Sequence, residues 1–217
     1  MELRILHRDA RCCVVDKPSG VAVHRGWARD DDPLIQRVRD AIGAYVFPVH
    51  RLDRGASGIS LFALDRDAAR AFSLAWPDAE KRYLAITRGH PPEHATIDHP
   101  IPRAPGEARV PAVTEIARLA TFGRYALVEA RPRTGRLHQI RRHLKHVSCP
   151  LIGDVRYGKG EHNRLFRSRF GLHRLALHAL EIALFHPRDG RPLRIFAPVP
   201  DDLADPLRAM GLPVPES

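Results

Sequence analysis

The sequence predicts an α+β fold with a central mixed, mostly antiparallel sheet flanked by helices and loops. Strand-like runs outnumber helical ones, and several of them are joined by tight turns in the manner of hairpins. The helical stretches fall between strands and carry apolar residues at a spacing of three to four. With 217 residues, the chain is long enough for a substantial core. We therefore expect one domain over residues 1–217.

The first half of the chain alternates strands with helices. Extended segments are predicted at residues 14–15, 21–23, 59–64 and 81–87. A first helix is expected after Asp32 and Pro33, because a capping residue followed by proline is typical of a helix start, and the apolar residues that follow recur every four positions. A second helix, capped by Asp65 or Asp67, should span residues 65–76 and stop at the next proline.

The second half is predicted to be richer in hairpins. Six prolines in residues 90–111 favour an irregular connection there. Apolar side chains at helical spacing predict an amphipathic helix over residues 136–147, with a basic flank and Arg141 next to the apolar seam. The remaining strands are expected in pairs, at residues 113–119 with 125–130 and at 177–186 with 193–196.

The charge balance indicates a polyanionic partner. The formal net charge is +10, from 35 basic and 25 acidic residues, and nucleic acid is the first candidate. Two segments concentrate the charge: residues 131–146 hold six basic residues and no acid, and residues 156–174 hold six against one glutamate. Charged helix faces also serve solubility, but two dense clusters favour a surface that follows phosphates.

Several other classes are disfavoured. No apolar stretch reaches the ~18 residues that a membrane span requires, and three cysteines, two of them adjacent, do not make a disulfide framework. Since the N-terminus does not resemble a signal peptide, we expect a reduced, cytoplasmic protein. The thirteen histidines lack ligand spacing, and no glycine-rich nucleotide motif occurs. We therefore expect neither a metal nor a nucleotide cofactor.

Three residues are candidates for chemistry. Asp53 lies between Arg51 and Arg54 and precedes a Gly-Ala-Ser-Gly segment. Flanking positive charge keeps a carboxylate ionised and aimed, which suits a nucleophile or a salt-bridged structural loop equally well. Tyr83, on a basic strand, fits cross-strand packing or base stacking equally well. Arg141 could be partly buried beside the helix seam.

Four segments together resemble one enzyme family. Residues 50–59 begin with His-Arg-Leu-Asp, and residues 81–89 contain Lys-Arg-Tyr-Leu-Ala and end on glycine. Residues 134–141 read Thr-Gly-Arg-Leu-His-Gln-Ile-Arg, and residues 150–158 contain Ile-Gly-Asp and Tyr-Gly. In order and spacing they resemble the RluA-type pseudouridine synthases, which include large-subunit rRNA and some tRNA enzymes. Ala56 departs from the usual threonine but removes no catalytic group.

The resemblance implies a pseudouridine synthase fold, without a preceding S4-like RNA-binding domain, and an isomerase acting on RNA without a cofactor. It implies Asp53 as the essential carboxylate, Tyr83 as the residue stacking on the uracil, and Arg141 as the arginine pairing with that carboxylate. We expect a monomer. The expected RNA-binding residues are Arg51, Arg54, Arg136, His138, Arg142 and Lys145.

The target of the enzyme is left between two RNA classes. Likeness outside the main motifs, including residues 24–27 and 170–172, favours the members that act on uridine 65 of tRNA. The first alternative keeps the same chemistry on a uridine of 23S rRNA. The second is a non-catalytic RNA-binding module, and the third, a metal-dependent nuclease, is disfavoured by the lack of clustered carboxylates.

Overall fold

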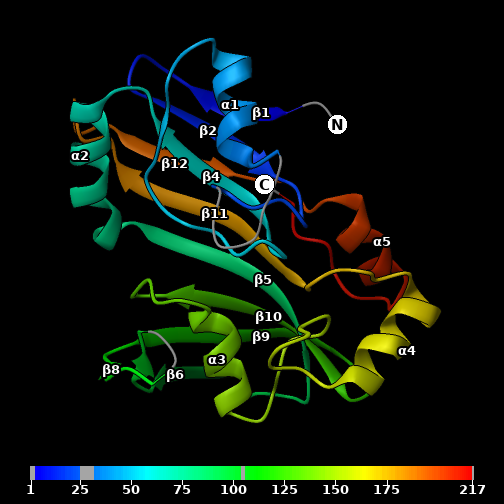
Figure 1. The fold of residues 1–217 in the computed structure, drawn as a ribbon. Helices are drawn as coiled ribbons and strands as arrows, with labels where there is room; N and C mark the ends of the chain where they lie inside the picture. Colours follow the sequence, from blue (N-terminus) through cyan, green and yellow to red (C-terminus); the bar gives the residue numbers. More distant parts are fainter. Residues whose placement is uncertain (1–2, 25–31, 104–105, 217) are drawn as a thin grey trace. The chain divides into compact units, whose positions relative to one another are not determined.

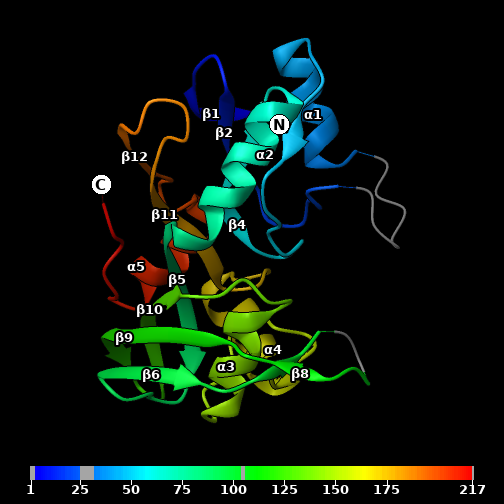
Figure 2. The same ribbon diagram turned by 90° about the vertical axis from the view of Figure 1, so that its left-hand side faces the viewer.

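The computed structural model describes residues 3–24, 32–103 and 106–216. It divides into two compact units, one formed by Met1–Glu80 with Ala179–Pro198 and the other by Lys81–His178 with Val199–Ser217. Each unit has its own strands and helices (Figures 1 and 2).

The first unit is a layer of strands with a helix packed on it. Its strands follow the order β1-β2-β4-β11, with β12 paired to β11 and β3 paired to β4. The helix α2 contacts β4. The strands are β1 (Arg4–Arg8), β2 (Cys12–Lys17), β3 (Phe47–Pro48), β4 (Ser57–Ala63), β11 (Leu177–Phe185) and β12 (Pro192–Phe196), and the helices are α1 (Leu34–Ile42) and α2 (Arg66–Ala75), the latter followed by a 3-10 turn, η1 (Trp76–Asp78).

The second unit has four strands in the order β5-β10-β9-β6 and a separate small hairpin, β7-β8. Helix α3 packs on β9 and β10, and α4 packs on α5; both pairs can be followed in Figure 1. The strands are β5 (Glu80–Arg88), β6 (His94–Asp98), β7 (Ile101–Pro102), β8 (Arg109–Val110), β9 (Val113–Phe122) and β10 (Tyr125–Pro132), and the helices are α3 (Gln139–His146), α4 (Gly160–Phe170) and α5 (Asp201–Ala209).

The α+β class and the mostly antiparallel pairing are confirmed. Strands β9 and β10 and strands β11 and β12 form antiparallel pairs, as the hairpin signals indicate. Strands β1 and β2 form another antiparallel pair, which was not predicted. The cores contain the apolar strand residues of each unit, for example Leu61 and Phe62 in the first unit and Ile86 and Leu127 in the second. Among the described residues, no helix combines the length and apolar character that a membrane crossing requires.

The helix signals are confirmed in part. Asp65 caps α2, because its carboxylate accepts from the Ala68 N–H at 2.7 Å. Asp32 was wrongly expected to cap α1: the N-cap is Pro33, and Asp32 pairs with Arg37 instead. The first N–H groups of α1 are satisfied by the carbonyl oxygens of residues 22 and 23, which accept from residues 34 and 35. The extended segment 21–23 therefore serves α1 and forms no strand.

Other boundaries differ from the prediction. The irregular connection expected at residues 90–111 was wrong, because β6, β7 and β8 lie within it; β6 is stabilised by pairing with β9, a partner distant in sequence. Helix α3 begins at Gln139, later than expected, because His138 adopts a left-handed backbone with φ 54°. Helices α4 and α5 were not predicted, and α5 carries a proline in its interior.

Candidate active site

Asp53 lies in a tight turn directly before β4. The Ala56 N–H donates to the Asp53 carbonyl oxygen at 3.0 Å, and the Asp53 side chain is half-buried. The Ser19 hydroxyl donates to the Gly55 carbonyl oxygen at 2.7 Å. The turn carrying the candidate carboxylate is therefore tied to a second loop of the same unit.

Lys17 holds these two loops together from inside the first unit. Its side chain has no exposed surface, and its ammonium donates to the carbonyl oxygens of Pro18, Val21 and Arg54 at 2.8, 2.7 and 3.2 Å. Burying an ammonium group is costly unless its donors are satisfied. The arrangement fixes the backbone next to Asp53. Sequence reasoning missed Lys17, and its only signal is a lysine at the end of an apolar strand.

Two further residues of the Asp53 motif have structural roles. The His50 Nε2 accepts from the Leu61 N–H at 3.1 Å, so this ring nitrogen carries no proton, and the ring stacks on Trp76. Gly58 has φ 105°, and a Cβ atom there would lie 2.2 Å from the Ala179 carbonyl oxygen. Glycine is therefore required where β4 approaches β11.

Tyr83 lies on β5 in the second unit, opposite Ala130 of β10, and is half-buried. Side chains alternate between the faces of a strand, so the neighbouring Arg82 points to the other face. There Arg82 donates twice to Glu129, at 2.8 and 3.0 Å, and Glu129 also pairs with Arg131. This ion-pair cluster fixes the opposite face of the strand that carries Tyr83.

Arg141 is a buried residue of α3, as its place by the apolar seam indicates, and it forms a bidentate pair with Asp154. The Nε atom donates to Oδ2 at 2.7 Å and Nη2 donates to Oδ1 at 2.9 Å. Burial by itself would raise the pKa of the Asp154 carboxyl, but hydrogen bonds from Arg141 and from the backbone of Tyr157 and Arg156 lower it below the ordinary value. Sequence reasoning missed Asp154, although it lies in the Ile-Gly-Asp motif.

Tyr157 joins the candidate residues of the basic segment. Its hydroxyl is 3.0 Å from Arg142 Nε and 3.1 Å from His138 Nδ1. The guanidinium carbons of Arg141, Arg142 and Arg156 lie 5.1, 6.0 and 5.5 Å from its ring centroid. An aromatic face attracts such cations. The loop before α3 and the loop after it are therefore joined through one ring.

The predicted RNA-binding residues divide by exposure. Arg51, Arg136 and Lys145 are exposed. Arg54 is exposed too, but its Nε donates to the Gly20 carbonyl oxygen at 2.8 Å. The half-buried Arg142 also donates to the Pro102 carbonyl oxygen, at 2.7 Å, so part of its hydrogen-bonding capacity serves the fold.

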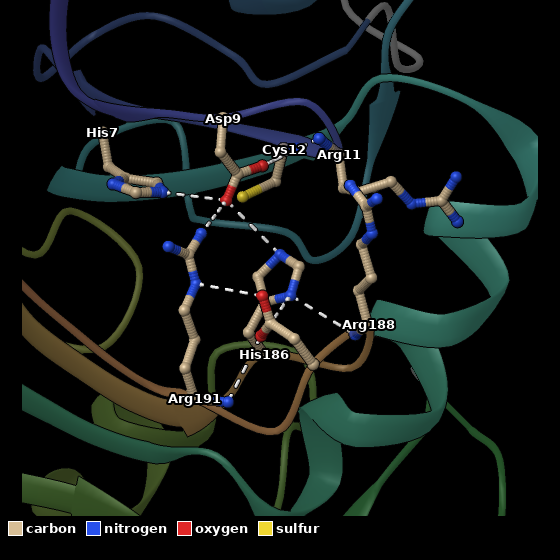
Figure 3. A network of polar contacts seen from close by, with 8 residues as sticks. His7, Asp9, Arg11, Cys12, His186, Arg188 and Arg191 are labelled. Carbon is tan, nitrogen blue, oxygen red and sulfur yellow. Dashed lines mark hydrogen bonds and ion pairs between the residues drawn. The ribbon is translucent and has the colours of Figure 1, made fainter.

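One cluster of possible metal ligands occurs in the described parts of the chain. Donor atoms of His7, Asp9 and Cys12 lie within 4.8 Å of one another. Figure 3 shows Asp9 at the centre of a network that also includes His186 and Arg191. The Arg191 Nη2 atom lies 2.9 Å from Asp9 Oδ2.

The chemistry of this donor set does not fit a cation. Burial raises the pKa of the Cys12 thiol to about 12, and the Asp9 charge adds to the effect, so the sulfur remains a thiol instead of the thiolate that binds metals. The Asp9 carboxylate is already occupied by Arg191 and by the N–H groups of Arg11 and Cys12, at 2.7 and 2.9 Å. We interpret the cluster as a structural ion-pair network. Cys12, Cys13 and Cys149 are free and buried.

The three candidate catalytic residues are distributed over the two units. Asp53 belongs to the first unit, and Tyr83 and Arg141 belong to the second. Within the second unit the structure brings Arg141, His138 and Arg142 together around Asp154 and Tyr157.

The chain is similar in sequence and in structure to known RNA-modifying enzymes. Residues 11–146 match the family described as RNA pseudouridylate synthase. A protein of Haemophilus ducreyi named tRNA pseudouridine synthase C is 39% identical over 91% of this chain and 91% of its own length. A protein of the same name from Pectobacterium carotovorum is 39% identical over 90% of this chain, which spans 58% of that protein. The solved structure titled Human RNA Pseudouridylate Synthase Domain Containing 4 has a TM-score of 0.80 and 28% identity, over 98% of this chain and 95% of that one.

The chain belongs to the RNA pseudouridine synthase family. The matched stretch contains the Asp53 turn, Tyr83 and Arg141. The expected pseudouridine synthase fold is confirmed by the likeness to the human structure, and the family assigns the protein to the isomerases. The segment at residues 24–27, used in the closer sequence comparison, lies mostly outside the described residues.

Proposed function

We propose that this protein isomerises uridine to pseudouridine in tRNA, at uridine 65, with Asp53 as the essential carboxylate. The observation that carries the proposal is the similarity to proteins named tRNA pseudouridine synthase C over about nine-tenths of the chain. The family match includes residues of both units, which supports a single catalytic domain. We further propose that the enzyme acts in the cytoplasm as a monomer and without a cofactor.

The reaction is an isomerisation, so its atoms balance without a donor or an oxidant. The N1–C1′ bond of the nucleotide breaks, the uracil turns, and a C5–C1′ bond forms. The proton on C5 leaves and N1 gains one. A carboxylate promotes such a step by attacking the sugar or by removing a sugar proton. Either role requires Asp53 to be ionised and held in place, which fits the turn tied down by Lys17 and Ser19.

The other residues of the proposed site are assigned to the uracil, to the Asp53 carboxylate and to the phosphates of the RNA. A uridine in folded RNA must leave its stack to react, and Tyr83 is proposed to stack on the extruded uracil. Arg141 is proposed to hold the Asp53 carboxylate in its charged form. The phosphates would be bound by Arg51, Arg54, Arg136, His138, Arg142 and Lys145, of which the exposed arginines and lysine are suited to contacts that fix the register of the RNA.

Replacement of Asp53 tests the proposal directly. We expect Asp53→Asn to abolish turnover, because a neutral amide neither attacks the sugar nor takes its proton, while tRNA binding is largely retained. The measurement is tritium release from tRNA that carries 5-tritiated uridine, with thermal unfolding of each protein as the folding control. Wild-type turnover by Asp53→Asn would refute the assigned role.

A further inference from the structure

The guanidinium of Arg141 is held along one edge. Its Nε and Nη2 atoms donate to the two carboxylate oxygens of Asp154 in a bidentate pair. This geometry fixes both the plane and the rotation of the guanidinium. The remaining nitrogen, Nη1, lies outside this pair. The direction in which Arg141 presents Nη1 is therefore set by where the Asp154 carboxylate lies.

The Asp154 carboxylate is itself immobilised. Its residue is 1% exposed, and Oδ1 also accepts the N–H groups of Arg156 and Tyr157 at 2.9 and 3.0 Å. From α4, Asn163 accepts from the Gly153 N–H at 2.8 Å and donates to the Asp154 carbonyl oxygen at 3.1 Å. The backbone on both sides of the carboxylate is thus attached to a neighbouring helix.

The backbone before Asp154 lies directly against a neighbouring segment of the same unit. Gly153 has φ +76°, and a Cβ atom at this position would lie 1.9 Å from the Arg174 carbonyl oxygen. Only glycine permits this approach. On the other side of the turn, the Tyr157 ring lies beside Arg141 and its hydroxyl contacts Arg142. Arg141 is therefore enclosed by a rigid turn that Asp154 organises.

We propose that Asp154 is a positioning residue of the enzyme, which orients Arg141 for the isomerisation without touching the RNA. This inference rests on the proposed function, in which Arg141 acts on the essential carboxylate. An asparagine at position 154 would present an NH2 group to one of the arginine nitrogens, and two donors repel each other. The guanidinium would lose its fixed orientation, and misplacement of a catalytic group lowers the rate by roughly 10- to 100-fold.

Asp9 offers a matched control in the first unit. Like Asp154, it accepts the N–H groups of the residues two and three positions later, Arg11 and Cys12, at 2.7 and 2.9 Å. It also pairs with an arginine, Arg191, as Figure 3 shows. Asp9→Asn therefore removes the same kind of ion pair, beside the same kind of turn, in a cluster that the proposed chemistry does not use.

The experiment compares kcat and KM for tRNA with 5-tritiated uridine, together with Tm, for wild type, Asp154→Asn and Asp9→Asn. We expect both variants to lower Tm. Only Asp154→Asn should lower kcat, by roughly 10- to 100-fold, with KM little changed, because the RNA contacts are intact. The same substitution is also made in the Arg141→Lys variant, whose ammonium group has no plane for a bidentate partner to orient. There Asp154→Asn should lower kcat far less than it does in the wild-type background.

Asp154→Glu provides a second variant that keeps the charge. It moves the carboxylate by one methylene group, so kcat should fall again even though the ion pair and the fold persist. Wild-type kcat in Asp154→Asn or Asp154→Glu, or an equal loss in Asp9→Asn, would overturn the positioning role. These outcomes are separable from failure of the proposed function, which would appear as an active Asp53→Asn.

Discussion

Lys17 illustrates how a single buried side chain prepares the Asp53 turn. Its ammonium donates to the backbone carbonyl oxygens of Pro18, Val21 and Arg54, and Arg54 is next to Asp53. A buried ammonium with three satisfied donors restrains the chain far more than an exposed ion pair would, since solvent does not compete for its hydrogen bonds. The backbone next to the candidate carboxylate is therefore held from beneath the loop.

His143 is a second buried titratable residue, and it links α3 to β9. Its Nε2 lies 3.0 Å from the His99 carbonyl oxygen, which can only accept, so Nε2 carries the proton. Its Nδ1 lies 2.9 Å from the Thr114 hydroxyl and accepts from it. Burial, the largest influence, lowers the pKa of the imidazole below its ordinary value of 6.5. The network thus requires the neutral ring.

This leads to a prediction for the pH dependence of stability. The unfolded chain binds a proton near pH 6.5 that the folded His143 binds only at lower pH, so stability is fully present above that value and is lost as pH falls below it. The loss has a slope of at most about 1.4 kcal/mol per pH unit from one group. Urea unfolding between pH 7.5 and about 5 should show a shallower decline for His143→Gln than for wild type. Equal slopes would contradict the assignment.

At the residue scale, the sequence predicted functional residues that lie in a local motif. It did not predict residues whose role depends on hydrogen-bond partners far away in the chain. Asp53, Tyr83 and Arg141 stand in motifs that the sequence displays directly. Asp154 and Lys17 act through partners 13 and up to 37 positions away, and no local pattern reveals such pairs. The fold supplies them.

At the scale of elements, periodicity predicted those whose stability is local. Helix α2 has its own cap at Asp65, and β9 and β10 are joined by a tight turn at Gly123 and Arg124. In contrast, β6 is short and follows two prolines, and it becomes a strand only by pairing with β9. The late start of α3 depends on the left-handed backbone of His138, which helical spacing does not encode.

The approach of β4 to β11 gives a prediction at this scale. Gly58→Ala places a Cβ atom against the Ala179 carbonyl oxygen at a residue with φ 105°, so it should combine backbone strain of about 1–3 kcal/mol with a steric clash. Gly20→Ala is the control, because φ is +86° there but no atom lies within 4 Å of the added Cβ. Urea unfolding should show the larger loss for Gly58→Ala. A loss equal to that of Gly20→Ala would show that the strands separate without cost.

At the scale of the whole molecule, charge and family agree on a nucleic-acid substrate. The net charge of +10 favours a polyanion, and the family match from residue 11 to residue 146 includes residues of both compact units. The net charge and its concentration in two segments predicted the class of partner. The particular RNA is not encoded in composition, because phosphates are common to every RNA, and the proposal of tRNA rests on the named relatives.

Mapping of pseudouridine in cells without this gene, complemented with wild type or Asp53→Asn, tests the central claim most directly. We predict that uridine 65 of tRNA is unmodified in the deletion strain, that the wild-type gene restores pseudouridine there, and that Asp53→Asn does not. Restoration by Asp53→Asn, or a loss confined to 23S rRNA, would contradict the account.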